Sequence, residues 1–288
     1  MGRLWDAWDV LKHLRSPLEA AKLALPARAL KVHVLNPEPP RGASPDASAA
    51  AQALKRIKNE LALAALVDGR VDYAGLRGSP LLAELERAAS HLHAVRLSDL
   101  PSDAERIAFW LNVYNVLAIH GVIARGITRS VMQIPTFFAT TAYRVGDQRF
   151  TLDEVENGVL RRNQAGPKGG LPFAPDDPRL AWSPSAVDPR IHMALVCASA
   201  SCPPVAFFSP EGLDSELARA TQGFLDAEVR VTPAAVELPL VFRYYPADFG
   251  DVRAFLEQHG SPRLREALAA APDARWTYRR YDWSLNQV

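Results

Sequence analysis

The sequence is poor in cysteine and has no excess of charge of either sign. Its 288 residues include two cysteines, and 33 basic against 32 acidic side chains leave a formal net charge of +1. So few cysteines exclude a disulfide-rich secreted scaffold. The balanced charge gives no electrostatic reason to expect a nucleic-acid partner or an anionic membrane surface. What remains is an ordinary globular composition, 48% hydrophobic and 23% charged, in a chain long enough to bury a large core.

The chain also lacks a recognisable targeting signal near its first residue. Residues 1–25 have no basic start, apolar centre and small-residue cleavage site, and Asp6 stands where a myristoylation motif has Ser or Thr. We therefore expect a cytoplasmic protein by default. Residues 107–124 form a run of 18 residues without a formal charge, and this length is near the lower limit for a membrane span. Because two asparagines and a histidine interrupt them, we expect a buried core helix and no integral membrane segment.

Hydrophobic periodicity divides the chain into helices and short strands. An amphipathic helix over 4–25 and a proline-rich connector over 36–46 predict an N-terminal appendage, residues 1–46, on a single domain over 47–288. A protein partner could bind through this helix. Further along, the pattern predicts helices over 47–66, 80–95, 103–125, 153–162 and 209–226, hairpins over 142–152 and 229–242, and a strand over 191–196. The predicted fold class is α+β, helix-dominated, with a small and mostly antiparallel sheet.

Two helix starts are marked by capping boxes. Ser102 with Glu105 and Thr151 with Glu154 have the required spacing, and Gly126 is a candidate end of the first of these helices. Residues 163–190 are rich in glycine and proline and are predicted to be a long irregular loop that shapes a pocket.

The two cysteines flank a loop of small residues. Cys197 and Cys202 enclose the sequence Ala-Ser-Ala-Ser, whose small side chains favour a tight turn that presents N–H groups to an oxyanion. Ser199, Ser201 and Cys202 are therefore candidate binding residues. Four interpretations remain open: a nucleophilic thiol, a core residue, a short disulfide and a zinc site. The spacing H-x4-C-x4-C is not a standard zinc motif, so we expect neither a metal nor another cofactor.

The apolar helix supplies the candidate partners of the cysteines. Asn112, Asn115 and His120 fall within an arc of about 140°. Buried amides need hydrogen bonds, and the simpler expectation is that both asparagines hold the backbone of neighbouring loops, with ligand binding as the alternative. His120 is the candidate general base for Cys197, because an alternating strand would direct His192 away from that sulfur. His192 would instead orient a loop or contact a ligand.

Two charged residues of the predicted helix over 153–162 complete the candidate site. The helix dipole alone accounts for Glu156 near its start and Arg161 near its end. In the functional alternative, Glu156 orients a histidine and Arg161 binds a substrate carboxylate in a bidentate pair. The aromatic residues near the end of the chain are expected to pack in the core; they are Trp276, Tyr278, Tyr281 and Trp283.

Six segments, taken together, resemble one family. In chain order they are "VDYAGL" (71–76), "AFWLNVYNVLAIHGV" (108–122), "VENGVLR" (155–161), "RIHMALVCASASCPP" (190–204), "YPADFG" (245–250) and "YDWSLN" (281–286). Their order and spacing are similar to those of the family named domain of unknown function 547, over roughly residues 65–286. This resemblance implies no particular reaction.

Two hypotheses for the function follow. The first is a cysteine-dependent hydrolase or acyltransferase acting on an amide or thioester-like bond of a small-molecule or peptide-like substrate. In it Cys197 is the nucleophile, His120 the base and Glu156 the residue that orients a histidine. The second is a non-catalytic ligand-binding or scaffold domain in which the Asn, His and Cys residues are structural. Whether the protein is an enzyme stays open at this point.

Overall fold

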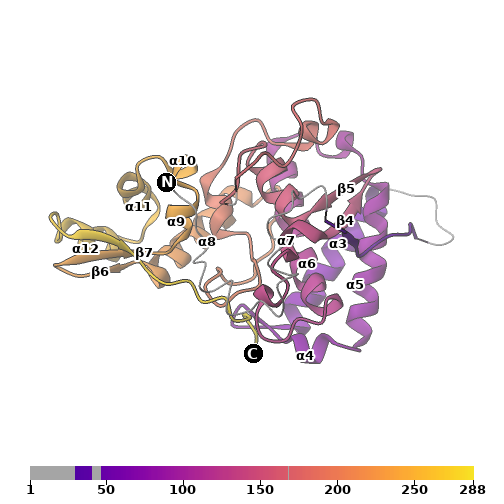
Figure 1. Ribbon diagram of the computed structural model, residues 1–288, viewed down its shortest axis with the longest axis horizontal. Coiled ribbons are helices and arrows are strands. Elements are labelled where there is room, and N and C mark those ends of the chain that lie inside the picture. The colour runs from indigo at the N-terminus through magenta and orange to yellow at the C-terminus, as the bar shows by residue number, and fades with distance from the viewer. Residues whose placement is uncertain (1–29, 41–46, 168) are drawn as a thin grey trace.

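The computed structural model describes residues 30–40, 47–167 and 169–288, and these form a helix-dominated α+β fold (Figure 1). The α-helices are α3 (Ala47–Ala64), α4 (Tyr73–Leu76), α5 (Pro80–Ser90), α6 (Asp103–Ala124), α7 (Phe137–Thr140), α8 (Leu213–Glu228), α9 (Val241–Tyr244), α10 (Pro246–Phe249), α11 (Val252–His259) and α12 (Pro262–Ala269). The helix predicted over 4–25 lies outside the described residues, so its roles as an appendage and as a partner-binding surface stay predictions.

Short strands and 3-10 helices connect the α-helices. The strands are β1 (His33–Val34), β2 (Leu66–Val67), β3 (Arg70–Val71), β4 (Thr141–Val145), β5 (Gln148–Thr151), β6 (Arg230–Val231), β7 (Ala235–Leu238) and β8 (Arg275–Tyr278). The 3-10 helices are η2 (His91–Ala94), η3 (Leu97–Asp99), η4 (Val131–Gln133), η6 (Pro178–Trp182) and η7 (Pro189–Met193), whereas η5 (Glu154–Leu160) is a π-helix.

The strands of the described residues form three small sheets rather than one. Their orders are β1-β4-β5, β2-β3 and β6-β7-β8. Antiparallel pairing joins β4 to β5, β2 to β3 and β6 to β7, while β1 and β8 add to their sheets in parallel. The predicted α+β class is therefore confirmed, and the strands form three separate small sheets where one was predicted.

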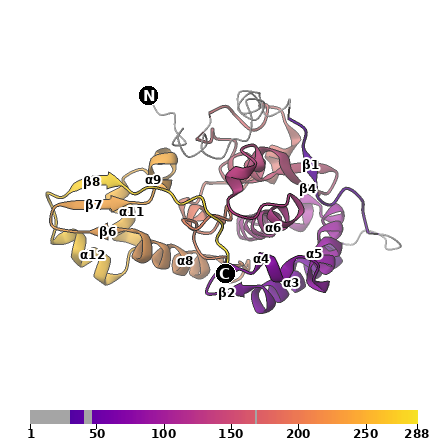
Figure 2. The same cartoon turned by 60° about the horizontal axis from the view of Figure 1, so that its bottom comes forward.

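Two hydrophobic clusters divide these elements into a larger and a smaller lobe. The larger lobe surrounds α6 and includes α3, α5 and the β1-β4-β5 sheet. The smaller lobe contains β6–β8 and α9–α12 (Figure 2). Helix α8 joins them, because Leu213 and Leu217 pack in the larger cluster and Phe224 and Leu225 in the smaller. After β8 the chain returns to the larger lobe, where residues near its end pair with Val71, Ser130 and Ser199.

Helix α6 is the central helix of the larger lobe. As predicted, its start is a capping box: the Ser102 N–H donates to Glu105 Oε2 at 2.8 Å, and the Glu105 N–H donates to Ser102 Oγ at 3.2 Å. Gly126 follows its last turn at φ +64°, the left-handed region that favours glycine. The helix is long and apolar enough to cross a membrane, but 83% of its most apolar 18-residue window is buried inside the structure. A helix buried to this extent by the rest of the protein is a core helix and not a membrane span.

The prediction of a strand over 191–196 is wrong. The segment begins as the 3-10 helix η7, in which the Asp188 side chain accepts from the Arg190 N–H at 2.9 Å and Pro189 occupies the first turn. A short apolar run does not by itself distinguish a strand from a buried helical turn, and the Asp-Pro pair at its start favours the helical turn. The alternation that separated His192 from Cys197 therefore does not apply.

Other local predictions differ in their outcomes. The hairpin over 142–152 is confirmed as β4 and β5, with Gly146 at φ +59° in the turn. The second hairpin is confirmed for β6 and β7, but residues 241–244 form helix α9 instead of a strand. Asn36, the first residue of the predicted connector over 36–46, is bonded to the larger lobe, because its amide donates to the carbonyls of Ala89 and Arg144 and the strand β1 just before it pairs with β4. The division into 1–46 and 47–288 stays a prediction.

Candidate active site

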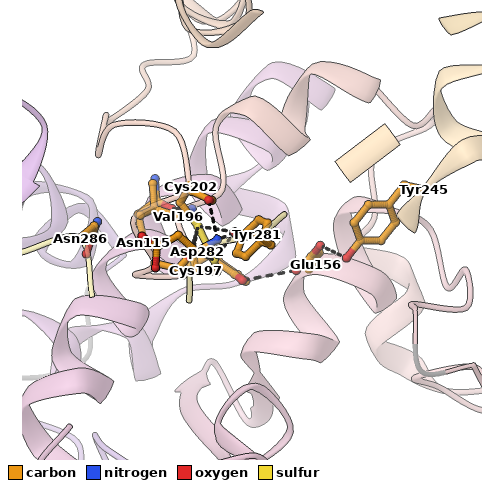
Figure 3. The surroundings of a disulfide bond; sticks show 12 residues. Asn115, Glu156, Val196, Cys197, Cys202, Tyr245, Tyr281, Asp282 and Asn286 are labelled. Atoms are coloured by element: carbon orange, nitrogen blue, oxygen red, sulfur yellow. Dashed lines mark hydrogen bonds between the residues drawn. A yellow bond between two sulfur atoms is a disulfide. The ribbon is translucent and has the colours of Figure 1, made fainter. Parts of the chain in front are cut away.

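The two cysteines form a disulfide in the wall of a cavity. Cys197 and Cys202 are joined through their sulfurs, and both residues line a cavity of about 790 Å³ (Figure 3). Of the four interpretations left open by the sequence, this structure has the disulfide. The long loop predicted to shape a pocket contributes Pro167, Leu171 and Pro172 to the same wall.

Three groups lie against the sulfur atoms. The Tyr281 hydroxyl is 3.1 Å from Cys197 Sγ and 3.2 Å from Cys202 Sγ, and the Cys197 N–H donates to Cys202 Sγ at 3.1 Å. Ser199, whose Oγ is 3.1 Å from Cys197 Sγ, donates its hydroxyl to the Tyr281 oxygen at 2.9 Å. Burial raises the pKa of Tyr281 above its usual range, so its hydroxyl keeps its proton at neutral pH and can donate it to sulfur. The sequence had placed Tyr281 in the core, without this role.

The asparagines of α6 hold the loop that carries the disulfide. The Asn115 amide donates to the carbonyls of Ala194 and Ala206 at 3.0 Å each, and its oxygen accepts from the Val196 N–H at 2.9 Å. Asn112 makes the same two-way contact with Phe208, at 2.8 Å and 2.9 Å. The simpler expectation, that these amides secure neighbouring backbone, is confirmed.

The residues before the end of the chain hold the other side of this loop. The Ala200 N–H donates to the Ser284 carbonyl, the Ser201 N–H to the Asp282 carbonyl, and the Cys202 N–H to the Ser199 carbonyl. In return, the Asp282 N–H donates to Ser201 Oγ at 2.8 Å. The loop does turn tightly, with Ala198 at φ +63°. Because the N–H groups of residues 200–202 are already bonded, these three do not bind an oxyanion in this conformation, and oxyanion binding by the other N–H groups of the loop stays a prediction.

His120 lies elsewhere in the core. Its Nδ1 is 2.8 Å from the Tyr143 hydroxyl of β4, and its Nε2 is 4.0 Å from Glu86 Oε1. Burial lowers the pKa of His120 to about 4, so the ring is neutral at pH 7. The prediction that His120 pairs with Cys197 is wrong in this structure, because both ring nitrogens face other side chains. Asn115 and His120 lie within one arc of about 140° around the α6 axis, and an arc of this width does not determine which neighbouring residue each side chain contacts.

Arg161 and His192 meet at a buried aspartate. Asp248 of α10 accepts from Arg161 Nε at 2.5 Å and from Arg161 Nη2 at 2.9 Å, and its Oδ2 lies 2.8 Å from His192 Nε2. Burial by itself raises the pKa of Asp248, but the hydrogen bonds and charges of His192 and Arg161 outweigh it and lower the pKa to about 2. Arg161 thus makes the predicted bidentate pair, but with this chain's own aspartate and not with a substrate carboxylate. Through Asp248, His192 links η7 to α10 of the smaller lobe, and it also lines the cavity, so both of its predicted roles stay predictions.

Glu156 of the π-helix η5 is held by two tyrosines. The Tyr245 hydroxyl donates to Glu156 Oε1 at 2.6 Å and the Tyr114 hydroxyl donates to Oε2 at 3.3 Å. Burial, together with the nearby carboxylate, raises the pKa of both tyrosines well above the usual range, so both remain donors. The prediction that Glu156 orients a histidine is wrong: His192 stacks on the Tyr245 ring, with centroids 4.2 Å apart, and its Nε2 donates to the Asp248 carboxylate.

Four residues of this site were missed by sequence reasoning: Tyr114, Tyr245, Asp248 and Tyr281. All four lie in the segments that carried the family resemblance. That resemblance marked the segments, but it could not distinguish residues of a cavity wall from residues of the core. Among the described residues, no group of three or more His, Cys, Asp and Glu side chains is arranged to hold a metal ion.

A comparison with protein families agrees with the resemblance noted from the six segments. The model of the family described as "Protein of unknown function, DUF547" matches residues 97–225. The resemblance to DUF547 is confirmed over these residues. The DUF547 match includes α6, η5 and the disulfide loop, whereas Tyr245, Asp248 and Tyr281 lie beyond it. The curated proteins and the solved structures compared with this chain gave no match.

Proposed function

We propose that this chain is a thiol-dependent enzyme whose reactive group is the Cys197–Cys202 pair. The observation that carries the proposal is the position of the disulfide, whose residues line a cavity of about 790 Å³ while the Tyr281 hydroxyl lies within 3.2 Å of each sulfur. The bond closes a loop with a sequence separation of 5, and short loops give a crosslink comparatively little entropic stabilisation. A role in chemistry therefore accounts for this placement better than a role in stability.

Thiol–disulfide exchange is the reaction that this arrangement supports best. A substrate thiolate attacks the Cys197 sulfur, the S–S bond breaks, and its electron pair passes to the Cys202 sulfur. The Cys197 N–H and the Tyr281 hydroxyl are donors to the thiolate that forms there. A second substrate thiolate then attacks the substrate sulfur of the mixed disulfide and expels the Cys197 thiolate, and Cys197 and Cys202 each take up one of the two protons that the substrate thiols released. Two substrate thiols are oxidised to a disulfide, and the protein disulfide is reduced to two thiols.

Hydrolysis or acyl transfer at an amide or thioester-like bond is the second candidate, and it starts from the reduced protein. The cavity has the size of small-molecule sites, and the Tyr281 hydroxyl would equally stabilise a Cys197 thiolate acting as the nucleophile. The thiolate would attack the carbonyl carbon, expel the leaving group and pass the acyl group to water or to another acceptor. This candidate still needs a base and oxyanion donors, because His120 and the amides of residues 200–202 are engaged elsewhere.

The proposal includes the cytoplasmic location expected from the sequence. In a reducing compartment a disulfide is usually transient and catalytic rather than structural. A disulfide in a cavity wall is accessible to a substrate thiol, as a catalytic disulfide must be.

Reduction kinetics test the proposal directly. The oxidised protein is mixed with excess dithiothreitol, and the appearance of thiols is followed by rapid alkylation and mass spectrometry. We expect faster reduction than in the unfolded chain. Tyr281→Phe should slow the reaction about tenfold, because a hydrogen bond to a charged group is worth about 1.5 kcal/mol or more. Tyr278→Phe is the matched control, since Tyr278 lies on β8 of the smaller lobe and is 45% exposed.

Two results would count against the proposal. Equal reduction rates for the folded and unfolded chains, unchanged by Tyr281→Phe, would leave the disulfide as a structural crosslink in a ligand-binding or scaffold domain. A reduced protein that consumes a thioester in repeated turnovers, while its oxidised form shows no advantage in disulfide exchange, would replace the first reaction by the second candidate.

A further inference from the structure

Glu156 differs from other carboxylates of the same cavity in its partners. Glu154 pairs with Arg179 at 2.8 Å, and Glu228 pairs with Arg279 at 2.9 Å. No ion pair found among the described residues includes Glu156, whose carboxylate receives two tyrosine hydroxyls instead. Among the described residues, neutral hydroxyl donors therefore solvate its negative charge, and no ion pair with a cation neutralises it.

The cation that contacts the Tyr245 ring is committed to another group. The Arg161 guanidinium lies 4.5 Å from the centre of the Tyr245 ring, but its Nε and Nη2 both donate to Asp248. A carboxylate offers roughly four acceptor positions, and the two tyrosine hydroxyls use two of them. None of the hydrogen bonds found among the described residues uses the remaining positions of Glu156, which lines the cavity.

The surroundings of Glu156 also suit a cation. A partly desolvated carboxylate is stabilised most by an opposite charge with hydrogen bonds, and aromatic rings attract cations through their faces. Tyr114 and Tyr281 both line this cavity, whereas the Tyr245 ring already contacts His192 and the Arg161 guanidinium. Figure 3 shows Glu156 between Tyr245 and the group formed by Tyr281 and the two cysteines, so one ligand in the cavity can meet both the carboxylate and the disulfide.

We infer that Glu156 binds a protonated amine of the substrate, and that the substrate is a small thiol carrying a primary ammonium group. This inference rests on the proposed thiol chemistry for its thiol half, while its ammonium half depends on Glu156 alone. Tyr114 and Tyr245 are positioning residues, because they act on the ligand by holding the Glu156 carboxylate.

The test compares thiols that differ in charge. Oxidised protein is reduced by cysteamine and longer amino-alkanethiols, by neutral 2-mercaptoethanol, and by anionic mercaptopropionate. Each rate is divided by the rate at which the same thiol reduces a small reference disulfide at the same pH, which corrects for the thiol's own reactivity. We expect at least one amino-thiol to react about tenfold faster than the neutral thiol, and the anionic thiol to react more slowly, since a charge-assisted hydrogen bond is worth about 1.5 kcal/mol or more. This comparison needs no variant.

Variants then assign the preference. In Glu156→Gln the ratio of cationic to neutral rates should fall to about one. Glu228→Gln is the matched control, because it removes one charge from the same cavity where that charge already has Arg279 as its partner, and it should keep the wild-type ratio.

The possible outcomes separate this inference from the proposed function. If every thiol reduces the protein quickly but charge makes no difference, the ammonium site is refuted and the thiol function stands. If no thiol reacts faster than with the unfolded chain, the function fails. Calorimetric titration of oxidised protein with S-methylcysteamine then decides the site alone: binding that Glu156→Gln abolishes supports it, and absence of binding overturns it.

Discussion

Replacing Asp248 by Asn tests the contact that joins η7, η5 and the smaller lobe. The wild-type aspartate accepts both Arg161 donors and the His192 ring nitrogen, and the Arg161 side chain is 3% exposed. The Asn side chain cannot neutralise that buried guanidinium. Removing one partner of a buried ion pair costs about 3–5 kcal/mol, and because Asn keeps one acceptor oxygen we expect the free energy of unfolding to fall by about 3 kcal/mol.

The pH dependence of this loss provides a second, independent check. The pKa of Asp248 is about 2 in the folded protein, against an ordinary value of 3.8, and one pKa unit corresponds to about 1.4 kcal/mol. A lowered carboxyl pKa stabilises the fold above the unfolded value and loses this effect as the pH falls through the folded value. About 2 kcal/mol of the wild-type stability should therefore disappear between about pH 5 and about pH 2. The gap between the wild type and Asp248→Asn should narrow over that range.

Urea unfolding followed by tryptophan fluorescence at several pH values measures both effects. Asp214→Asn is the matched control, because Asp214 also pairs with an arginine, Arg190, but its side chain is 91% exposed. Its stability should change by less than about 0.5 kcal/mol. A loss for Asp248→Asn as small as that of the control, or a gap that stays constant down to pH 2, would refute the role given to this contact.

The two remaining predictions concern side chains of α6. His120, with its pKa lowered to about 4 from 6.5, is 4% exposed, and its neutral form stabilises the fold above pH 6.5. The free energy of unfolding of the wild type should therefore fall by roughly 3 kcal/mol as the pH falls from 6.5 to 4. Urea titrations of His120→Gln should not show this loss. If the free energy of unfolding changed equally with pH in both proteins, the burial of a neutral His120 ring would be contradicted. Asn115→Ala should cost at least about 2 kcal/mol, since it leaves the Ala194, Val196 and Ala206 backbone groups without partners. Hydrogen exchange at Val196 should also accelerate, and unchanged protection there would show that Asn115 does not hold the disulfide loop.

Several elements of this fold could be predicted because their signals are local. The capping box of Ser102 and Glu105, the left-handed Gly126 and the turn at Gly146 each depend on residues a few positions apart, and short-range hydrogen bonds and backbone sterics decide them in any context. The strand predicted over 191–196 failed because apolar character alone cannot separate a strand from a helical turn. The Asp188-Pro189 start of η7 was the local signal that should have prevailed.

The sequence by itself determined the class of the fold, the buried character of α6 and the segment that holds both cysteines. Only the tertiary structure decided which side chains meet: Tyr245 reaches Glu156 across 89 positions, Asp248 reaches Arg161 across 87, and Tyr281 reaches Cys197 across 84. The same packing directed His120 to Tyr143 and not to a sulfur. The reason is physical. Periodicity and capping depend on neighbours along the chain, whereas the partner of a buried polar group is set by how helices and loops pack, and no spacing in the sequence records that geometry.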